Sequence, residues 1–362
     1  MVKVTLENVT HIYDKKVKAV DNLNIEIPHG KLTALLGPSG CGKTTTLRII
    51  AGLLYPTFGK VYFDERDVTI VPPEKRNVAM VFQFPVVYSV MTVYENLAFP
   101  LRIKKLSKDQ IDKEVKKVAQ FLGIEHYLHL KPTGLSADLK QKIALGRALI
   151  KQADILILDE PLTNIDPLAR VELREKILQI KKETGITTIY VTHDQAEALT
   201  LADLIAVMRE GKILQFASPE DVYNHPTNTF VAWFLGNPGM NLVKGILRRI
   251  NSKTYVELDS VQIHLPTAIW EEIAKRVSIN EIIFGIRPES VEVYTESRPG
   301  CIYTKISTVE DTGALRIATV NLGDVEIKVK TEKFLKEGQE VYIKFPIEYV
   351  KIFDKDGNLI YG

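Results

Sequence analysis

The residues with the clearest chemical pattern form one glycine-rich stretch, Gly37 to Thr45, which reads GPSGCGKTT. It fits the pattern G-x-x-x-x-G-K-[ST], in which a glycine-rich loop turns its backbone N–H groups toward phosphate oxygens. Lys43 can reach the β and γ phosphates of a nucleotide, and the hydroxyl of Thr44 can bind Mg²⁺. The flanking residues predict a buried strand over 31–36 and a helix over 44–54 whose N-terminus faces the anion.

Two carboxylates end a second apolar run, ILILDE, at Ile155 to Glu160. The four apolar residues predict a buried parallel strand, and ligands of open α/β sheets bind at the carboxyl ends of such strands. Asp159 could hold Mg²⁺ through water, since that cation prefers oxygen ligands, and Glu160 could polarise an attacking water molecule. The alternative is two solvated acids at a strand end, but the phosphate-loop pattern favours a site.

Two more polar residues stand at the ends of predicted strands. Gln83 ends the strand predicted over 78–83, and His193 follows the strand predicted over 187–192. At the carboxyl edge of a sheet the glutamine could reach a ligand and the histidine a γ-phosphate. The alternatives are a surface glutamine and a structural histidine.

Helix signals separate these strands. The predicted helices cover 107–122, with a capping box at its start, 135–150, with Ser136 as N-cap, and the stretch from Asp166-Pro167 to about Thr184. Asp194 can cap a further helix. Tyr13 is expected on a loop, where its ring could stack on a base or simply pack. Residues 84–100 are expected to be irregular and are apolar enough to be core or a docking surface.

The bulk composition is that of a globular protein of two domains. The chain has 362 residues, 45% hydrophobic and 25% charged, and its net charge of +2 gives no support for nucleic-acid binding. Of the two cysteines, Cys41 lies inside the glycine-rich stretch, so a reducing compartment is expected. The sequence shows neither a signal-peptide core nor a run of about 18 apolar residues.

The pattern changes after about residue 235. Gly236, Pro238 and Gly239 indicate a linker. Beyond them, short alternating segments with turn residues predict a small β-barrel or sandwich, interrupted by one helix over 268–277. The predicted strands cover residues 255–258, 261–265, 281–286, 304–309, 315–321, 325–329, 341–345 and 350–353. The expected domains are therefore 1–235 and 236–362, and the second contains no recognisable catalytic constellation.

With these motifs in place, the chain resembles the ATP-binding subunits of ABC transporters, most of all the maltose-type importers with a C-terminal OB-like domain. GPSGCGKTT resembles the Walker A loop, ILILDE the Walker B strand, VFQ at 81–83 the Q-loop, NID at 164–166 the D-loop and TH at 192–193 the switch histidine. FLGNPGMN (234–241) and FGIRPES (284–290) resemble C-terminal segments of this branch. The resemblance implies an α/β P-loop ATPase domain with a helical subdomain, followed by a small β-barrel.

The resemblance also implies roles for individual residues. Tyr13 would stack on adenine, Glu160 would be the catalytic base, and His193 would hold the γ-phosphate and the water. Thr44, Gln83 and Asp159 would arrange Mg²⁺ or its waters, and Asp166 would belong to the D-loop. The nucleotide-binding loop would comprise Gly37, Pro38, Ser39, Gly40, Cys41, Gly42, Lys43, Thr44 and Thr45.

One motif departs from the family. Where the family reads LSGGQ, this chain has LSADL at 135–139, so the trans-acting signature would be Ser136, Ala137 and Asp138. Ala137 adds a Cβ where close backbone approach is wanted, and Asp138 adds a charge that competes with phosphate for the helix N-terminus. Two arrangements stay open, pairing with a different ATPase subunit that has an intact signature and a homodimer with slow or adapted sites.

The partners and location follow from the resemblance alone. It implies ATP, Mg²⁺, a second ATPase subunit, membrane permease subunits that dock on residues 84–100, indirectly a solute-binding protein, and no nucleic acid. The chain would lie peripherally on the cytoplasmic face of the membrane. A sugar or related polyol is the expected solute, with a nucleotide-binding regulator of little hydrolysis as the alternative. A soluble repair or translation ATPase is disfavoured, because no second Walker A occurs and no heptad run separates Lys43 from Asp159.

Overall fold

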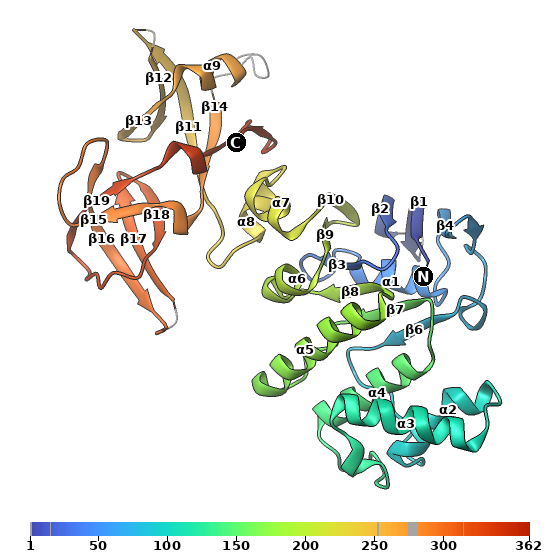
Figure 1. Ribbon diagram of the computed structural model, residues 1–362. Helices are drawn as coiled ribbons and strands as arrows, with labels where there is room; N and C mark the ends of the chain where they lie inside the picture. The colour runs from blue at the N-terminus through green and yellow to red at the C-terminus, as the bar shows by residue number, and fades with distance from the viewer. Residues whose placement is uncertain (1, 15, 252, 274–280, 314) are drawn as a thin grey trace. The chain divides into compact units, whose positions relative to one another are not determined.

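The computed structural model describes residues 2–14, 16–251, 253–273, 281–313 and 315–362. The chain folds into two compact units, one ending at Pro219 and the other comprising Glu220–Gly362. Both are drawn in Figure 1. The α/β domain followed by a small β-domain that the sequence predicts is confirmed.

The N-terminal unit contains a mostly parallel sheet of six strands. The strands lie in the order β10-β9-β3-β8-β7-β6, and all neighbouring pairs are parallel except β10 with β9. They comprise β3 (Leu32–Leu36), β6 (Val78–Val81), β7 (Ile155–Asp159), β8 (Thr187–Thr192), β9 (Leu204–Arg209) and β10 (Lys212–Ala217). Every residue of β3, β7 and β8 is buried, as expected for strands that are covered on both faces.

A second, antiparallel sheet covers one face of this core. Its strands lie in the order β2-β1-β4-β5, with β1 (Val4–Tyr13), β2 (Val17–Ile27), β4 (Phe58–Phe63) and β5 (Arg66–Asp67). Helix α1 (Lys43–Ala51) contributes Leu47, Ile49 and Ile50 to a core that includes residues of both sheets. The loop before α1 is therefore attached to a helix that is fixed by apolar packing on two sides.

Helices cover the other face of the parallel sheet. They comprise α2 (Val93–Ile103), α3 (Lys108–Leu122), α4 (Ala137–Ile150), α5 (Pro167–Thr184) and α6 (Gln195–Leu201). The helices α2, α3 and α4 contact one another and form the predicted helical group (Figure 1). The capping box of Ser107 and Gln110 is confirmed, as are the caps by Asp166 and Asp194.

The prediction for residues 84–100 is wrong. The stretch is not irregular throughout, because α2 begins at Val93 with a capping box formed by Thr92 and Glu95. The N-cap position of Ser136 at the start of α4 is confirmed, although its hydroxyl accepts no hydrogen bond from the first turn. The box at Thr92 was missed because proline at position 100 suggests a break, whereas here it lies within the helix.

The C-terminal unit is built of two antiparallel sheets around one apolar core. One has the order β13-β12-β11-β14-β20-β21 and the other β15-β19-β16-β17-β18. The strands are β11 (Asn241–Ile250), β12 (Lys253–Leu258), β13 (Val261–Leu265), β14 (Glu281–Ile286), β15 (Glu292–Tyr294), β16 (Ile302–Asp311), β17 (Arg316–Leu322), β18 (Val325–Lys330), β19 (Glu340–Lys344), β20 (Lys351–Phe353) and β21 (Leu359–Tyr361).

All eight strands predicted in this unit are present, and β11, β15 and β21 were missed. The predicted helix over 268–277 begins as α9 (Thr267–Ile273), and its remaining residues lie outside the described ranges. β11 alternates less cleanly than its neighbours, since Gly245 interrupts it and its last three residues are all exposed. A broken alternation of this kind gives a weak strand signal.

Two short helices, α7 (Pro219–Asn224) and α8 (Thr229–Phe234), are anchored to the C-terminal sheets by Arg287. This buried guanidinium donates hydrogen bonds to the carbonyls of Tyr223, Ala232 and Leu235, and it stacks 3.8 Å from the centre of the Tyr223 ring. Burial lowers the pKa of Arg287. The division after Pro219 thus lies earlier than the expected boundary at 235, because these contacts join both helices to the second unit.

We expect Arg287→Met to destabilise the C-terminal unit by about 2–4 kcal/mol, because it leaves buried carbonyls without donors. Urea unfolding of the full chain, followed by the fluorescence of Trp233 and Trp270, measures the change. Arg298→Met is the matched control, since Arg298 is exposed and stacks on Tyr294 in the same unit. Equal stability of the two variants would contradict the anchoring role of Arg287.

Candidate functional site

The glycine-rich loop lies between β3 and α1, and two of its glycines leave no room for a side chain. A Cβ on Gly37 would lie 2.3 Å from the Met208 carbonyl oxygen and 2.7 Å from the Cys41 sulfur. Gly42 has a φ of +104°, and a Cβ there would lie 2.4 Å from the Ala19 carbonyl oxygen. The tight loop that the pattern requires is therefore present, with the N-terminus of α1 directly after it.

The Lys43 ammonium group is held inside this loop. Its Nζ donates to the carbonyl oxygens of Gly37 at 2.7 Å and Pro38 at 3.0 Å, and only 5% of the residue is exposed. Ser39 and Gly40 are exposed at the loop tip, while Thr44 and Thr45 are half-buried. The loop thus surrounds a buried cation with backbone, an arrangement suited to binding a polyphosphate.

Asp159 lies beside the start of α1. Its carboxyl group is hydrogen-bonded to the Thr44 side chain, and the positive charges of Arg48 and Lys43 lie near it. Burial and the neighbouring charge of Glu160 nevertheless raise the pKa of Asp159. A hydroxyl and a buried carboxylate are oxygen donors of the kind that Mg²⁺ takes together with phosphate oxygens and water, so these residues fit that cation.

The carboxylate of Glu160 contacts three polar side chains from different parts of the chain. Its Oε2 lies 3.0 Å from the Nδ1 of His193 and accepts hydrogen bonds from Gln83 Nε2 at 3.4 Å and Thr163 Oγ1 at 3.3 Å. Three segments that are distant in sequence, 81–83, 159–163 and 192–193, therefore converge at one carboxylate. Thr163 was not predicted as a site residue. Its hydroxyl lies only three residues after Glu160, and this short spacing could have indicated the contact.

The backbone of Glu160 is strained, with a φ of +46°. Its N–H donates to the Val191 carbonyl at 2.9 Å, which ties this conformation to β8. Such left-handed non-glycine residues are uncommon and are retained where neighbouring structure holds them. The strain turns the Glu160 side chain to the same edge of the sheet as His193.

Tyr13 is the last residue of β1, so the predicted loop at this position is wrong. The strand continues because Tyr13 pairs with Val17 across a tight turn. Its hydroxyl lies 3.4 Å from Thr45 Oγ1, and its ring packs edge-on against His11 at 4.5 Å. A half-buried aromatic ring is thus placed next to the glycine-rich loop.

The remaining predicted site residues lie at helix starts. Ser136, Ala137 and Asp138 form the N-terminus of α4, and among the described residues no hydrogen bond or ion pair joins them to the glycine-rich loop. Asp166 accepts hydrogen bonds from the N–H groups of Leu168 and Ala169 and so caps α5. Both cysteines, Cys41 and Cys301, are free, and burial raises the pKa of Cys41.

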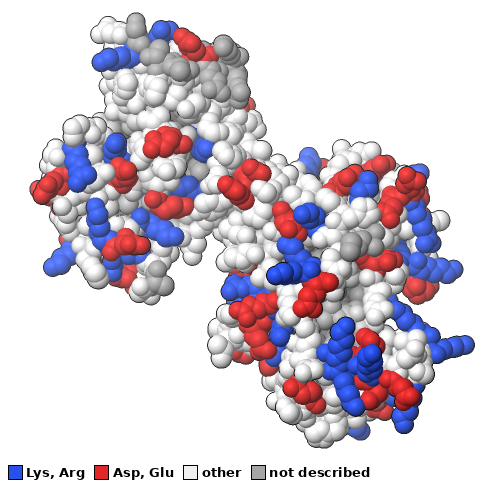
Figure 2. Space-filling view, viewed as in Figure 1, with Lys and Arg blue, Asp and Glu red and all other residues white. Residues whose placement is uncertain are grey.

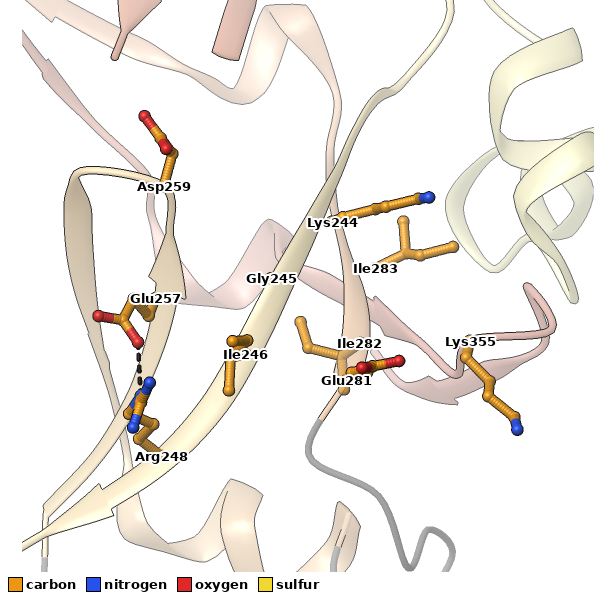
Figure 3. A pocket seen from close by; sticks show the side chains of 10 residues that line it. All are labelled: Lys244, Gly245, Ile246, Arg248, Glu257, Asp259, Glu281, Ile282, Ile283 and Lys355. Carbon is orange, nitrogen blue, oxygen red and sulfur yellow. Dashed lines mark hydrogen bonds and ion pairs between the residues drawn. The ribbon is translucent and has the colours of Figure 1, made fainter. Parts of the chain in front are cut away.

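A separate cavity of about 710 Å³ lies in the C-terminal unit. Figure 3 shows its lining, in which Arg248 and Glu257 form an ion pair at 2.5 Å. The described lining comprises Lys244, Gly245, Ile246, Arg248, Glu257, Asp259, Glu281, Ile282, Ile283 and Lys355. Its charged lining residues are of both signs, three basic and three acidic. Both charge signs are also interspersed on the described part of the face in Figure 2, as a net charge of +2 suggests.

The fold and the site together define a P-loop nucleotide-hydrolysing domain joined to a β-barrel domain. None of the helices within the described ranges is long and apolar enough to cross a membrane.

Comparisons with known proteins identify the family. The ABC transporter family model matches residues 20–163, and the MalK OB fold domain model matches residues 236–291. The trehalose/maltose import ATP-binding protein MalK of Thermococcus litoralis is 39% identical over 98% of both chains, and the oligosaccharides import ATP-binding protein MsmX of Bacillus subtilis is 38% identical over 98% of both. The chain therefore belongs to the ABC transporter ATP-binding proteins of the MalK type, and it is an ATPase.

Solved structures agree on the N-terminal fold. The chain is similar to cbiO1 from Clostridium perfringens, part of an ABC transporter complex, with 30% identity, a TM-score of 0.57 and coverage of 60% of this chain and 89% of that one. It is also similar to a dimeric ATP-binding cassette in a post-hydrolysis state bound to ADP and Pi, with 28% identity, a TM-score of 0.55 and coverage of 60% and 98%.

We expect Tyr13→Ala to weaken ATP binding by about 1–3 kcal/mol, because base stacking on an aromatic ring contributes about that much. Tyr13→Phe keeps the ring and loses only the contact with Thr45, so its affinity should stay close to that of the wild type. Titration calorimetry with ATP and with inorganic triphosphate measures both. A loss of the same size for triphosphate would show that Tyr13 acts on the loop and not on the base.

Proposed function

We propose that this chain is the ATP-hydrolysing subunit of an importer for a small solute, a sugar or related polyol. The observation that carries the proposal is that Gln83 and His193 both contact the carboxylate of Glu160, which lies next to the hydrogen-bonded pair of Thr44 and Asp159. Two relatives that match over 98% of their length are named as import ATP-binding proteins for trehalose/maltose and for oligosaccharides, which supports a sugar as the solute.

The glycine-rich loop would bind the phosphates of ATP. Lys43 would leave its two loop carbonyls to contact the β and γ phosphates, while the N–H groups from Ser39 to Thr45 would donate to phosphate oxygens. Thr44, Gln83 and Asp159 would hold Mg²⁺ directly or through water. When bound, that cation neutralises charge on the phosphates.

Glu160 would act as the base on the attacking water. Its Oε2 already accepts hydrogen bonds, so it is placed to orient a water molecule and take its proton. His193 lies 3.0 Å away with 54% of its side chain exposed, so its ring can turn from the carboxylate to a γ-phosphate oxygen. The proton on His193 would then stabilise the charge that develops on the transferred group.

Partners complete the proposal. A second ATPase subunit would place the N-terminus of its own α4 against the nucleotide. Membrane permease subunits would dock on residues 84–100, and a solute-binding protein would act through them. The chain would lie peripherally at the cytoplasmic face of the membrane. Residues 236–362 would form the regulatory or dimerisation domain.

The altered signature supports a second reading, a nucleotide-binding regulator with little hydrolysis of its own. Ala137 and Asp138 begin α4, where the family's glycines would allow the helix N-terminus to approach a phosphate closely. The presence of Glu160 and His193 in hydrogen-bonding distance favours hydrolysis instead.

The ATPase rate of the purified chain as a function of protein concentration separates these readings. We expect a rate per subunit that rises with concentration, because two chains must meet, and that falls at least about 10²-fold in Glu160→Gln. ATP binding without turnover at any concentration would contradict hydrolysis by this chain alone. It would lead to a search for a second ATPase subunit with an intact signature.

We also expect the double variant Ala137→Gly and Asp138→Gly to raise the rate of the chain alone by about tenfold or more, since donors to a developing charge contribute about 10²–10³ in rate. The single variants separate the two effects, because Ala137→Gly removes only the Cβ and Asp138→Gly removes the charge. Asp109→Gly is the matched control, because Asp109 occupies the same helical position in the first turn of α3. An unchanged rate in the double variant would show that these two residues do not limit turnover.

A further inference from the structure

A buried carboxylate lies directly behind the turn that carries His193. Glu197, in the first turn of α6, is only 6% exposed. Its Oε2 accepts hydrogen bonds from the hydroxyl of Tyr190 at 2.8 Å and from the hydroxyl of Thr192 at 2.8 Å. Both donors belong to the last residues of β8. The carboxylate therefore holds the strand end that leads into His193.

The residue after His193 is tied into the same group of contacts. The Asp194 N–H donates to Thr192 Oγ1 at 2.9 Å, and the Asp194 carboxylate accepts from the Glu197 N–H at 3.1 Å. Glu197, Thr192 and Asp194 thus form a closed ring of hydrogen bonds around His193. The peptide unit after the histidine is therefore fixed through the Asp194 N–H, and the residue before it is fixed through its hydroxyl.

The His193 side chain itself has little support. Among the described residues its hydrogen bond is to Glu160, at 3.0 Å, and 54% of the side chain is exposed. The direction of an exposed ring with one partner depends on the backbone from which it projects. That backbone is the part of the turn that Glu197 holds.

The surroundings of Glu197 show that its burial is costly. Burial and the charge of Asp194 raise the pKa of Glu197, whereas the hydroxyl donors and the charge of Arg170 oppose that rise. The Nε atom of Arg170 is buried and has no hydrogen-bond partner among the described residues. The carboxylate also supplies the acceptor for the buried hydroxyls of Tyr190 and Thr192, so its contacts join the end of β8 to the start of α6.

We propose that Glu197 is a positioning residue for His193, holding the turn between β8 and α6 so that the imidazole faces Glu160 in the nucleotide-free protein and lies within reach of the γ-phosphate when ATP binds. This inference rests on the proposed role of His193 in hydrolysis. Glu197 itself contacts neither the nucleotide loop nor Glu160 in the hydrogen bonds of the described residues. Its effect must pass through Thr192 and Asp194.

The kinetic test uses Glu197→Met, which keeps about the same side-chain length but removes the oxygen that accepts from both Tyr190 and Thr192. We expect kcat to fall about tenfold, since small misplacements of catalytic groups have effects of this size or larger, while KM for ATP stays within about twofold. Glu175→Met, an exposed change on α5, is the matched control. An unchanged kcat, or a rise in KM with kcat intact, would overturn the proposal.

A second measurement reports on position without hydrolysis. The ring nitrogen signals of His193, assigned in the nucleotide-free protein by comparison with His193→Gln, should shift when Glu160→Gln removes a charge 3.0 Å away. In the Glu197→Met background the same change should give a much smaller shift, because the ring no longer faces Glu160. Equal shifts in both backgrounds would show that Glu197 does not position His193.

The kinetic measurement and the ring signals distinguish a failure of the proposed function from a failure of the proposed role of Glu197. If the wild type does not hydrolyse ATP, the proposed function fails, and the ring signals still decide the role of Glu197. If Glu197→Met does not fold, Thr192→Val removes the shared hydroxyl while preserving shape, and the same shifts are measured on it. A variant that is less stable but has normal kcat and normal shifts would assign Glu197 to the core alone.

Discussion

The site depends on one geometric constraint, the parallel alignment of β3, β8 and β7. In this register Leu36 lies beside Thr192, and Val191 lies beside Asp159. The loop after β3, the turn after β8 and the acids that end β7 are therefore brought to one edge of the sheet. Because all three strands are buried on both faces, a shift in their alignment would move apolar side chains out of two cores.

The charges at this edge are arranged in two groups. Lys43 and Arg48 lie toward Asp159 and the glycine-rich loop, whereas Glu160 faces an amide, a hydroxyl and an imidazole. Two adjacent carboxylates repel each other, and burial adds to that cost. The nearby cations offset the cost for Asp159. The strained backbone at Glu160 turns the second carboxylate away, so that the neighbouring acids can do different work.

Much of this site could be predicted because its signals are local. The glycine-rich loop, the acids that end a buried strand and the caps at Asp166 and Asp194 each follow from a few adjacent residues. The strand position of Tyr13 could not be predicted, because it depends on pairing with Val17 across a turn that has no glycine. The ring of contacts around Glu197 combines two elements, and nothing in its spacing distinguishes it from an ordinary helical glutamate.

The attachment of α7 and α8 to the C-terminal sheets bears on how such proteins diversify. A guanidinium after β14 reaches back over more than fifty positions to carbonyls in two short helices. An ancestral recombination that exchanged C-terminal modules after residue 235 would have joined an arginine of one lineage to helices of another. A crossover near Pro219 keeps the arginine and both helices together, so related chains with exchanged C-terminal units should carry their breakpoints there.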